Sequence, residues 1–262
     1  MWLRLRAYGG SRAVAIMIKT PQEIAKMRRS GEVLQKVHQA VRAAVVPGAT
    51  TMDLENVAAK KIAELGAQPA FKGYHGYPAC LCTSVNDEVI HGIPAAQKVL
   101  AEGDIVSVDC GVILDGFYSD AAVTIPVGRL APAARKLLDV TQQSLDAAIQ
   151  EVQVGATIGD VGAAVQEAVE ANGFSVVRDF VGHGIGKSLH EDPQIPNYGT
   201  RGKGPKLRAG MVLAIEPMVN AGAAEVKVLE DGWTAVTIDG AWSAHFEHTV
   251  AVTENGPLIL TR

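Results

Sequence analysis

The chain has 262 residues, of which 48% are hydrophobic and 20% are charged, a composition typical of a globular protein with a substantial core. Its net charge of −4 gives no electrostatic basis for general binding to nucleic acid or to an anionic membrane. Three cysteines, Cys80, Cys82 and Cys110, are too few for a disulfide framework and indicate a reducing cytoplasm, and no apolar run reaches the roughly 18 residues of a membrane span.

The first 16 residues contain three arginines and no acidic residue. We interpret residues 1–16 as a flexible N-terminal extension that lies upstream of the organised sequence, and Met17 as a candidate for the true start of translation. No low-complexity linker divides the remainder. Residues 17–262 are therefore predicted to form a single domain.

Apolar residues at helical spacing predict four helices. The first helix is expected to begin at Thr20-Pro21-Gln22-Glu23, where Thr is a favourable cap and Pro a favourable first residue, and to end before Pro47-Gly48. The other three are expected at about 51–66, 131–152 and 157–172.

Strand-like runs lie between and after these helices. They cover residues 104–113, 117–126, 174–181, 210–219, 224–229, 233–238 and 244–253. Helices and strands do not alternate in the regular way that a parallel sheet requires. The fold class predicted from this order is α+β.

An internal repeat relates two of the predicted strands. Leu100–Asp109 (LAEGDIVSVD) and Leu207–Glu216 (LRAGMVLAIE) align without a gap, and each ends in an acidic residue. A second acidic residue follows on a later strand in each case, Asp120 in the first half and Glu247 in the second. Chance resemblance between two amphipathic strands is the alternative, but we favour a pseudo-twofold domain in which each half contributes two carboxylates.

Asp115-Gly116 between two apolar runs predicts a two-residue hairpin turn. This turn pairs Gly111 with Asp120 and places Asp109 on the same face of the sheet, diagonal to Asp120. Two buried carboxylates at that range cannot both be ionised unless a cation neutralises them, so either one is protonated or a metal is bound. Four such carboxylates favour two divalent ions of the type of Mn, Fe, Co or Zn.

The stretch Phe180–Gly199 (FVGHGIGKSLHEDPQIPNYG) carries two histidines among four glycines. Its GIGKS segment does not match a phosphate-binding loop, because that motif requires glycine at position 181, which is Val181. The glycines would allow the loop to approach a metal closely. His183 is therefore a candidate nitrogen ligand.

Five segments in this order resemble type I methionine aminopeptidase: NDEVIHGIP, VDCGVILDGFYSD, GHGIGKSLHEDPQIPNYG, LAIEPM and AHFEHTVAVT. The resemblance covers the chain from Met17 to its end. It implies the pita-bread fold, a pseudo-twofold antiparallel sheet with helices packed on its outer face and a dimetal site at its centre. Proline-directed peptidases share this fold and metal pattern and are the alternative, and a non-catalytic protein that binds nascent chains is a second one.

The resemblance also implies the chemistry. Two divalent ions would be held by Asp109, Asp120, His183, Glu216 and Glu247. Asp120 and Glu247 would bridge the ions, Asp109 would bind one, and His183 and Glu216 the other. A metal-bound hydroxide would attack the first peptide bond, with Glu216 as general base. His190 would contact the scissile carbonyl oxygen and His91 the scissile amide nitrogen.

By the same resemblance, the methionine side chain of the substrate would bind among Tyr74, Tyr77, Cys82 and Trp233. Two positions in this pocket depart from the family pattern: Phe71 stands where a small residue is common, and Leu189 replaces an aromatic residue. Leu189 is expected to enlarge or reshape the pocket, and Phe71 to refill it in part.

Two further histidines flank Glu247. His245 would share the face of Glu247 and His248 would lie on the opposite face, because side chains alternate along a strand. We interpret both as structural residues.

The expected substrates and partners are the N-termini of nascent polypeptides at the ribosome. No stable nucleic-acid partner and no membrane association are expected. The predicted state is a cytoplasmic monomer.

Overall fold

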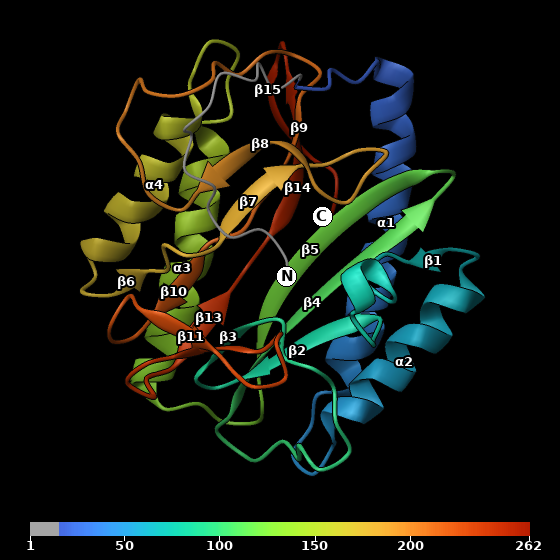
Figure 1. Cartoon of the computed structure of the whole chain (residues 1–262), viewed down its shortest axis with the longest axis vertical. Coiled ribbons are helices and arrows are strands. Elements are labelled where there is room, and N and C mark those ends of the chain that lie inside the picture. The colour runs from blue at the N-terminus through green and yellow to red at the C-terminus, as the bar shows by residue number, and fades with distance from the viewer. Residues whose placement is uncertain (1–15) are drawn as a thin grey trace.

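The computed structural model describes residues 16–262 (Figure 1). Apart from Ile16, the extension expected at residues 1–16 lies outside these residues. The four predicted helices are confirmed, as α1 (Pro21–Ala44), α2 (Thr51–Glu64), α3 (Pro132–Gln150) and α4 (Ile158–Glu170). Within the described part of the chain, none of the helices has the length and apolar character that crossing a membrane requires.

Three of the helices begin with a reciprocal capping box. At α1, the Thr20 hydroxyl accepts from the backbone N–H of Glu23, and the Glu23 carboxylate accepts from the backbone N–H of Thr20. Thr50 with Asp53 caps α2 in the same way, and Thr157 with Asp160 caps α4. Each box satisfies two N–H groups that the helix itself leaves unpaired.

The strands form four small sheets in which every pairing is antiparallel. The strands are β1 (Gln68–Pro69), β2 (Leu81–Val85), β3 (Glu88–Ile90), β4 (Ile105–Leu114), β5 (Phe117–Pro126), β6 (Ser175–Val176), β7 (Val181–Gly184), β8 (Glu191–Pro196), β9 (Val212–Ile215), β10 (Met218–Asn220), β11 (Val226–Val228), β12 (Ala235–Thr237), β13 (Ser243–His245), β14 (His248–Thr253) and β15 (Gly256–Ile259). In the sheets that carry the site, β4 lies between β5 and β2, and β9 lies between β14 and β7.

The predicted hairpin between β4 and β5 has the expected register. Leu114 pairs with Phe117 and Gly111 pairs with Asp120. The turn residues Asp115 and Gly116 both have positive φ, at 50° and 77°, as a tight two-residue turn of this kind requires. Asp109 and Asp120 therefore share one face of the sheet, as predicted.

The internal repeat extends beyond the two strands to the helices that precede them. Leu100 N donates to Ala49 O just before α2, and Leu207 N donates to Ala156 O just before α4. Gly103 and Gly210, at equivalent positions of the repeat, have nearly equal positive φ values of 92° and 89°. The chain thus consists of two similar halves, each with two helices followed by the strands that carry its acidic residues.

Three predicted strands are interrupted in the structure. Residues 174–181 divide into β6 and the start of β7, residues 210–219 into β9 and β10, and residues 244–253 into β13 and β14. Pro217, which has no N–H to donate to a sheet, follows Glu216 at the second break. Glu216 and Glu247 lie in the breaks themselves, so these two carboxylates leave the regular alternation of a strand.

Each half has its own apolar core, in which its two helices pack against its central strands. In the first half, residues of α1, α2 and β4 pack together, for example Leu34, Leu54 and Val106. In the second half, residues of α3, α4 and β9 do so. Figure 1 shows α1 and α2 on one side of the strands and α3 and α4 on the other, so the central strands lie between the two pairs of helices.

Candidate metal centre

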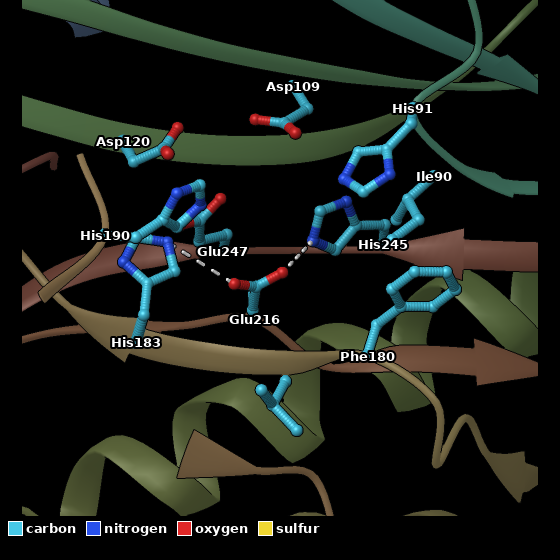
Figure 2. Close-up of a pocket in the computed structure, with 11 residues that line it drawn as sticks. Ile90, His91, Asp109, Asp120, Phe180, His183, His190, Glu216, His245 and Glu247 are labelled. Carbon is cyan, nitrogen blue, oxygen red and sulfur yellow. Dashed lines mark ion pairs between the residues drawn. The ribbon is translucent and has the colours of Figure 1, made fainter. Parts of the chain in front are cut away.

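A cavity lies where the two halves meet. It is lined by Ile90, His91, Asp109, Asp120, Phe180, Val181, His183, His190, Glu216, His245 and Glu247. Figure 2 shows the carboxylates of both halves pointing into the same space. All five predicted metal ligands and both histidines predicted to contact the substrate are therefore brought together.

Threonine side chains join the two halves beside these carboxylates. The Thr249 hydroxyl on β14 donates to Asp120 O and accepts from Asp120 N. On β5, the Thr124 hydroxyl donates to His245 O and accepts from His245 N. Glu247 N also donates to Ala122 O of β5. These bonds fix the backbone of one half against the acidic residues of the other.

The four carboxyl groups are buried close to one another, and this raises their pKa values. For Asp109, Glu216 and Glu247 the pKa lies well above its usual range, mainly because of burial and then because of neighbouring carboxylates. Burial raises the pKa of Asp120 to about 7. Protein groups alone thus do not stabilise four negative charges in this cavity.

The same groups fit a divalent cation. One oxygen each of Asp109, Asp120 and Glu247 is buried without a hydrogen-bond partner among residues 16–262, although buried polar atoms are nearly always paired. Ligand atoms of Asp120, His183 and Glu247 lie within 4.8 Å of one another. A cation at this place would satisfy the unpaired oxygens and remove the repulsion.

His183 is prepared to act as a ligand. Its Nδ1 lies 2.9 Å from the carbonyl oxygen of Gly184, and because a carbonyl only accepts, Nδ1 must carry the proton. Nε2 then holds a free lone pair and lies 3.7 Å from Glu216 Oε1. Burial lowers the pKa of His183 to about 4, so the ring is neutral at neutral pH, as metal binding requires.

His190 follows a loop that a buried ion pair anchors. Glu191 accepts from the backbone N–H groups of Lys187 and Ser188. Its other carboxylate oxygen lies 2.6 Å from Lys19 Nζ, and the two side chains are only 6% and 11% exposed. Lys19 N donates to Gly210 O as well. Lys19 thus connects the loop before His190 to the strand that leads to Glu216.

Replacing Lys19 by Met is expected to lower the free energy of unfolding by about 3–5 kcal/mol, because the buried Glu191 carboxylate would lose its only oppositely charged partner among residues 16–262. Denaturant unfolding measures this change. Lys61→Met is the matched control, since Lys61 pairs with Glu64 at the surface and its loss should cost less than about 1 kcal/mol. Equal effects of the two substitutions would contradict the structural role of the buried pair.

His91 occupies the opposite end of the cavity from His190 (Figure 2). It has a positive φ of 60°, a conformation that non-glycine residues rarely adopt and that is concentrated at functional sites. Its ring packs edge-on against Phe180, with ring centroids 5.6 Å apart. Burial lowers the pKa of His91 to about 3, so the imidazole is neutral.

The structure also places His245 at the cavity. We interpreted this residue as structural; it lines the cavity, and its Nε2 lies 3.7 Å from Glu216 Oε2. Neither ring nitrogen has a hydrogen-bond partner within residues 16–262. The signal in the sequence was the two-residue spacing between His245 and Glu247, which predicted that the two side chains share a face.

The ring of His248, in contrast, contacts Thr261: its Nδ1 lies 3.0 Å from Thr261 Oγ1. Ile90 and Phe180 also line the cavity, without a sequence signal.

The residues predicted for the methionine pocket belong to one apolar cluster beside the cavity. Its buried members include Phe71, Tyr77, Cys82 and Leu189, and Tyr74 and Trp233 pack against them. The rings of Tyr77 and Trp233 lie edge to face with centroids 5.1 Å apart. The two departures from the family pattern, Phe71 and Leu189, thus occupy the same cluster.

Comparison with known proteins agrees with this site. The model of metallopeptidase family M24 matches residues 25–254. The chain is 53% identical to a methionine aminopeptidase of Clostridium perfringens over 246 residues, covering 94% of this chain and 98% of that protein. It is 50% identical to methionine aminopeptidase 1 of Bacillus subtilis over 247 residues, covering 94% and 99%.

The crystal structure of methionine aminopeptidase from Thermotoga maritima superposes with a TM-score of 0.93 at 53% identity, covering 95% of this chain and all of that one. The fold and the acidic, histidine-containing centre are therefore those of a metallopeptidase, and the chain belongs to family M24. Within that family it groups with the methionine aminopeptidases. The pita-bread fold predicted from the sequence is confirmed.

Proposed function

We propose that this enzyme hydrolyses the first peptide bond of new polypeptides and releases the initiator methionine when the second residue is small. The observation that supports this most strongly is the convergence of five ligand side chains and two neutral histidines in one buried cavity. The near full-length relatives at about 50% identity are methionine aminopeptidases, which favours this function over a proline-directed peptidase or a non-catalytic binding protein.

The cofactor in this proposal is a pair of divalent ions from the group of Co, Mn, Fe and Zn. Asp109, Asp120, His183, Glu216 and Glu247 would hold these ions. When bound, such ions activate water and polarise a carbonyl group. Two observations support this assignment: carboxylate oxygens in the cavity lack a hydrogen-bond partner among residues 16–262, and Nε2 of His183 carries no proton.

The protein's own groups then position the peptide and move protons. Glu216 acts as the general base, because its carboxylate faces the cavity between two imidazoles. His190 donates a hydrogen bond to the scissile carbonyl oxygen and to the negative charge that develops there. His91 contacts the scissile amide nitrogen, and its strained backbone supports a functional role.

The apolar cluster that includes Phe71, Tyr77, Cys82 and Leu189, with Tyr74 and Trp233 at its edge, binds the methionine side chain in this proposal. Burying a side chain of this size contributes about 1.5–3 kcal/mol. Phe71 refills part of the space that Leu189 opens.

Peptide substrates test the proposal directly. With Mn(II) or Co(II), we expect kcat/KM for Met-Ala-Ser to exceed that for Ala-Ala-Ser by about 10–150-fold, from the apolar burial of one side chain. Ala-Pro-Ser should be cleaved no faster than Ala-Ala-Ser. A preference for Ala-Pro-Ser would indicate the proline-directed alternative, and no release of methionine with either metal would contradict the main proposal.

The site of action follows from the substrate. We propose that the enzyme works in the cytoplasm, as a monomer, on nascent chains at the ribosome. The three cysteines are buried free thiols, which agrees with a reducing compartment.

A further inference from the structure

The ring of His190 is held by a residue from the opposite half of the chain. Tyr74 Oη lies 2.7 Å from His190 Nδ1, and the two residues are separated by 116 positions. Tyr74 comes from a short helical turn (Tyr74–Gly76), whereas His190 directly precedes β8. The His190 ring also packs edge-on against His183, with centroids 4.4 Å apart. The Tyr74 hydroxyl thus forms a hydrogen bond with Nδ1 and connects the apolar cluster to the candidate metal centre.

This contact bears on which nitrogen of His190 carries the proton. A neutral imidazole has one N–H donor and one lone pair, and the 2.7 Å separation of Oη and Nδ1 is that of a hydrogen bond in which one of the two groups donates. Burial raises the pKa of Tyr74, and the phenol therefore keeps its proton. When the phenol donates to Nδ1, the imidazole proton must be on Nε2.

We propose that Tyr74 is a positioning residue for His190: its hydroxyl donates to Nδ1 and thereby fixes the tautomer that presents an N–H at Nε2. This inference rests on the proposed function, in which His190 donates to the scissile carbonyl. The opposite tautomer would present a lone pair to that oxygen, and the two would repel. Tyr74 thus acts on the reaction through His190, in addition to bordering the methionine pocket.

Tyr74→Phe removes only the hydroxyl group and keeps the ring in the apolar cluster. We expect kcat for Met-Ala-Ser to fall by about 10–100-fold, the range found when a partner that orients a functional group is lost. KM should change by less than about threefold, because the methionine side chain still meets an aromatic ring. Tyr198→Phe is the matched control, since Tyr198 packs against the core of the second half and should keep the kcat of the unaltered enzyme.

Nitrogen-15 NMR of the histidine rings in metal-free protein reads the tautomer without reference to activity. His190→Gln identifies the His190 signals among the seven histidines. In the unaltered protein we expect an unprotonated Nδ1 and a protonated Nε2, and in Tyr74→Phe a mixture of both tautomers. A protonated Nδ1 in the unaltered protein, or identical ring signals in both, would overturn the inference.

His190→Ala separates this inference from the function on which it rests. Full activity of the His190→Ala variant would contradict the proposed role of His190 itself. A large loss in His190→Ala together with normal kcat in Tyr74→Phe would refute only the role of Tyr74.

Discussion

Replacing Glu216 by Gln is expected to lower kcat for Met-Ala-Ser by about 10²–10⁴-fold, the usual contribution of a positioned general base. Glutamine has nearly the same shape, but its amide cannot take up a proton. The loss should be large because Glu216 lies in the break between β9 and β10, where His183 and His245 flank its carboxylate at 3.7 Å each. Steady-state kinetics at saturating Mn(II) measure the effect.

Glu216 is also a proposed ligand, so metal content must be measured with the kinetics. Glu230→Gln is the matched control, because Glu230 is exposed and undergoes the same chemical change. If Glu216→Gln kept normal kcat with normal metal content, neither the base assignment nor the mechanism proposed for this centre would stand.

Adding Mn(II) or Co(II) to metal-free protein is expected to raise its melting temperature by roughly 5–10 °C. At a free metal concentration 100 times the dissociation constant, binding adds about 2.7 kcal/mol to the stability of the folded state, and 1 kcal/mol corresponds to about 2–4 °C for a chain of this size. The physical source is the neutralisation of buried carboxylates that repel one another. Calorimetry with and without a chelator measures the shift.

Asp120→Asn makes this test sharper, because it should have opposite effects on the two states. Without metal, the variant loses one of the mutually repelling acidic groups and should melt at a higher temperature than the unaltered protein. With metal, it lacks a proposed bridging ligand and should gain little. Asp139→Asn, at an exposed position of α3, should change neither value. If Asp120→Asn retained the full gain from metal, Asp120 would not be a ligand.

The sequence predicted the helices and the β4–β5 hairpin because their signals are local. Thr20 with Glu23 marks a helix start, and Asp115-Gly116 permits the turn that fixes the register of Asp109 and Asp120. The repeat predicted that acidic residues of two halves would meet. The proposed set of metal ligands required the resemblance to a family as well, because spacing alone does not say which carboxylates would bind metal.

Other features depend on contacts between distant segments. The breaks at Glu216 and Glu247 look like continuous strands in the sequence, since apolar residues lie on both sides of each break. Strand β8 contains Pro193 and Pro196 and was not predicted, although an edge strand tolerates proline. His245 comes beside Glu216 through the pairing of β10 with β13, and Tyr74 comes beside His190 only when the halves pack together.

The correspondence between the halves also shows where they differ. On β4, Ser107 pairs with Ser84 of β2. The equivalent residue of the second half, Ala214 on β9, pairs with His183 of β7. The position that supplies an imidazole in one half therefore holds a serine in the other. Two ions bound between the halves would meet unequal donor sets, one with a nitrogen ligand and one with oxygen ligands alone. Because nitrogen and oxygen ligands favour different metals, the two positions should bind any one metal with different affinities. They should therefore fill one after the other, and a preparation with limiting metal should contain singly loaded enzyme.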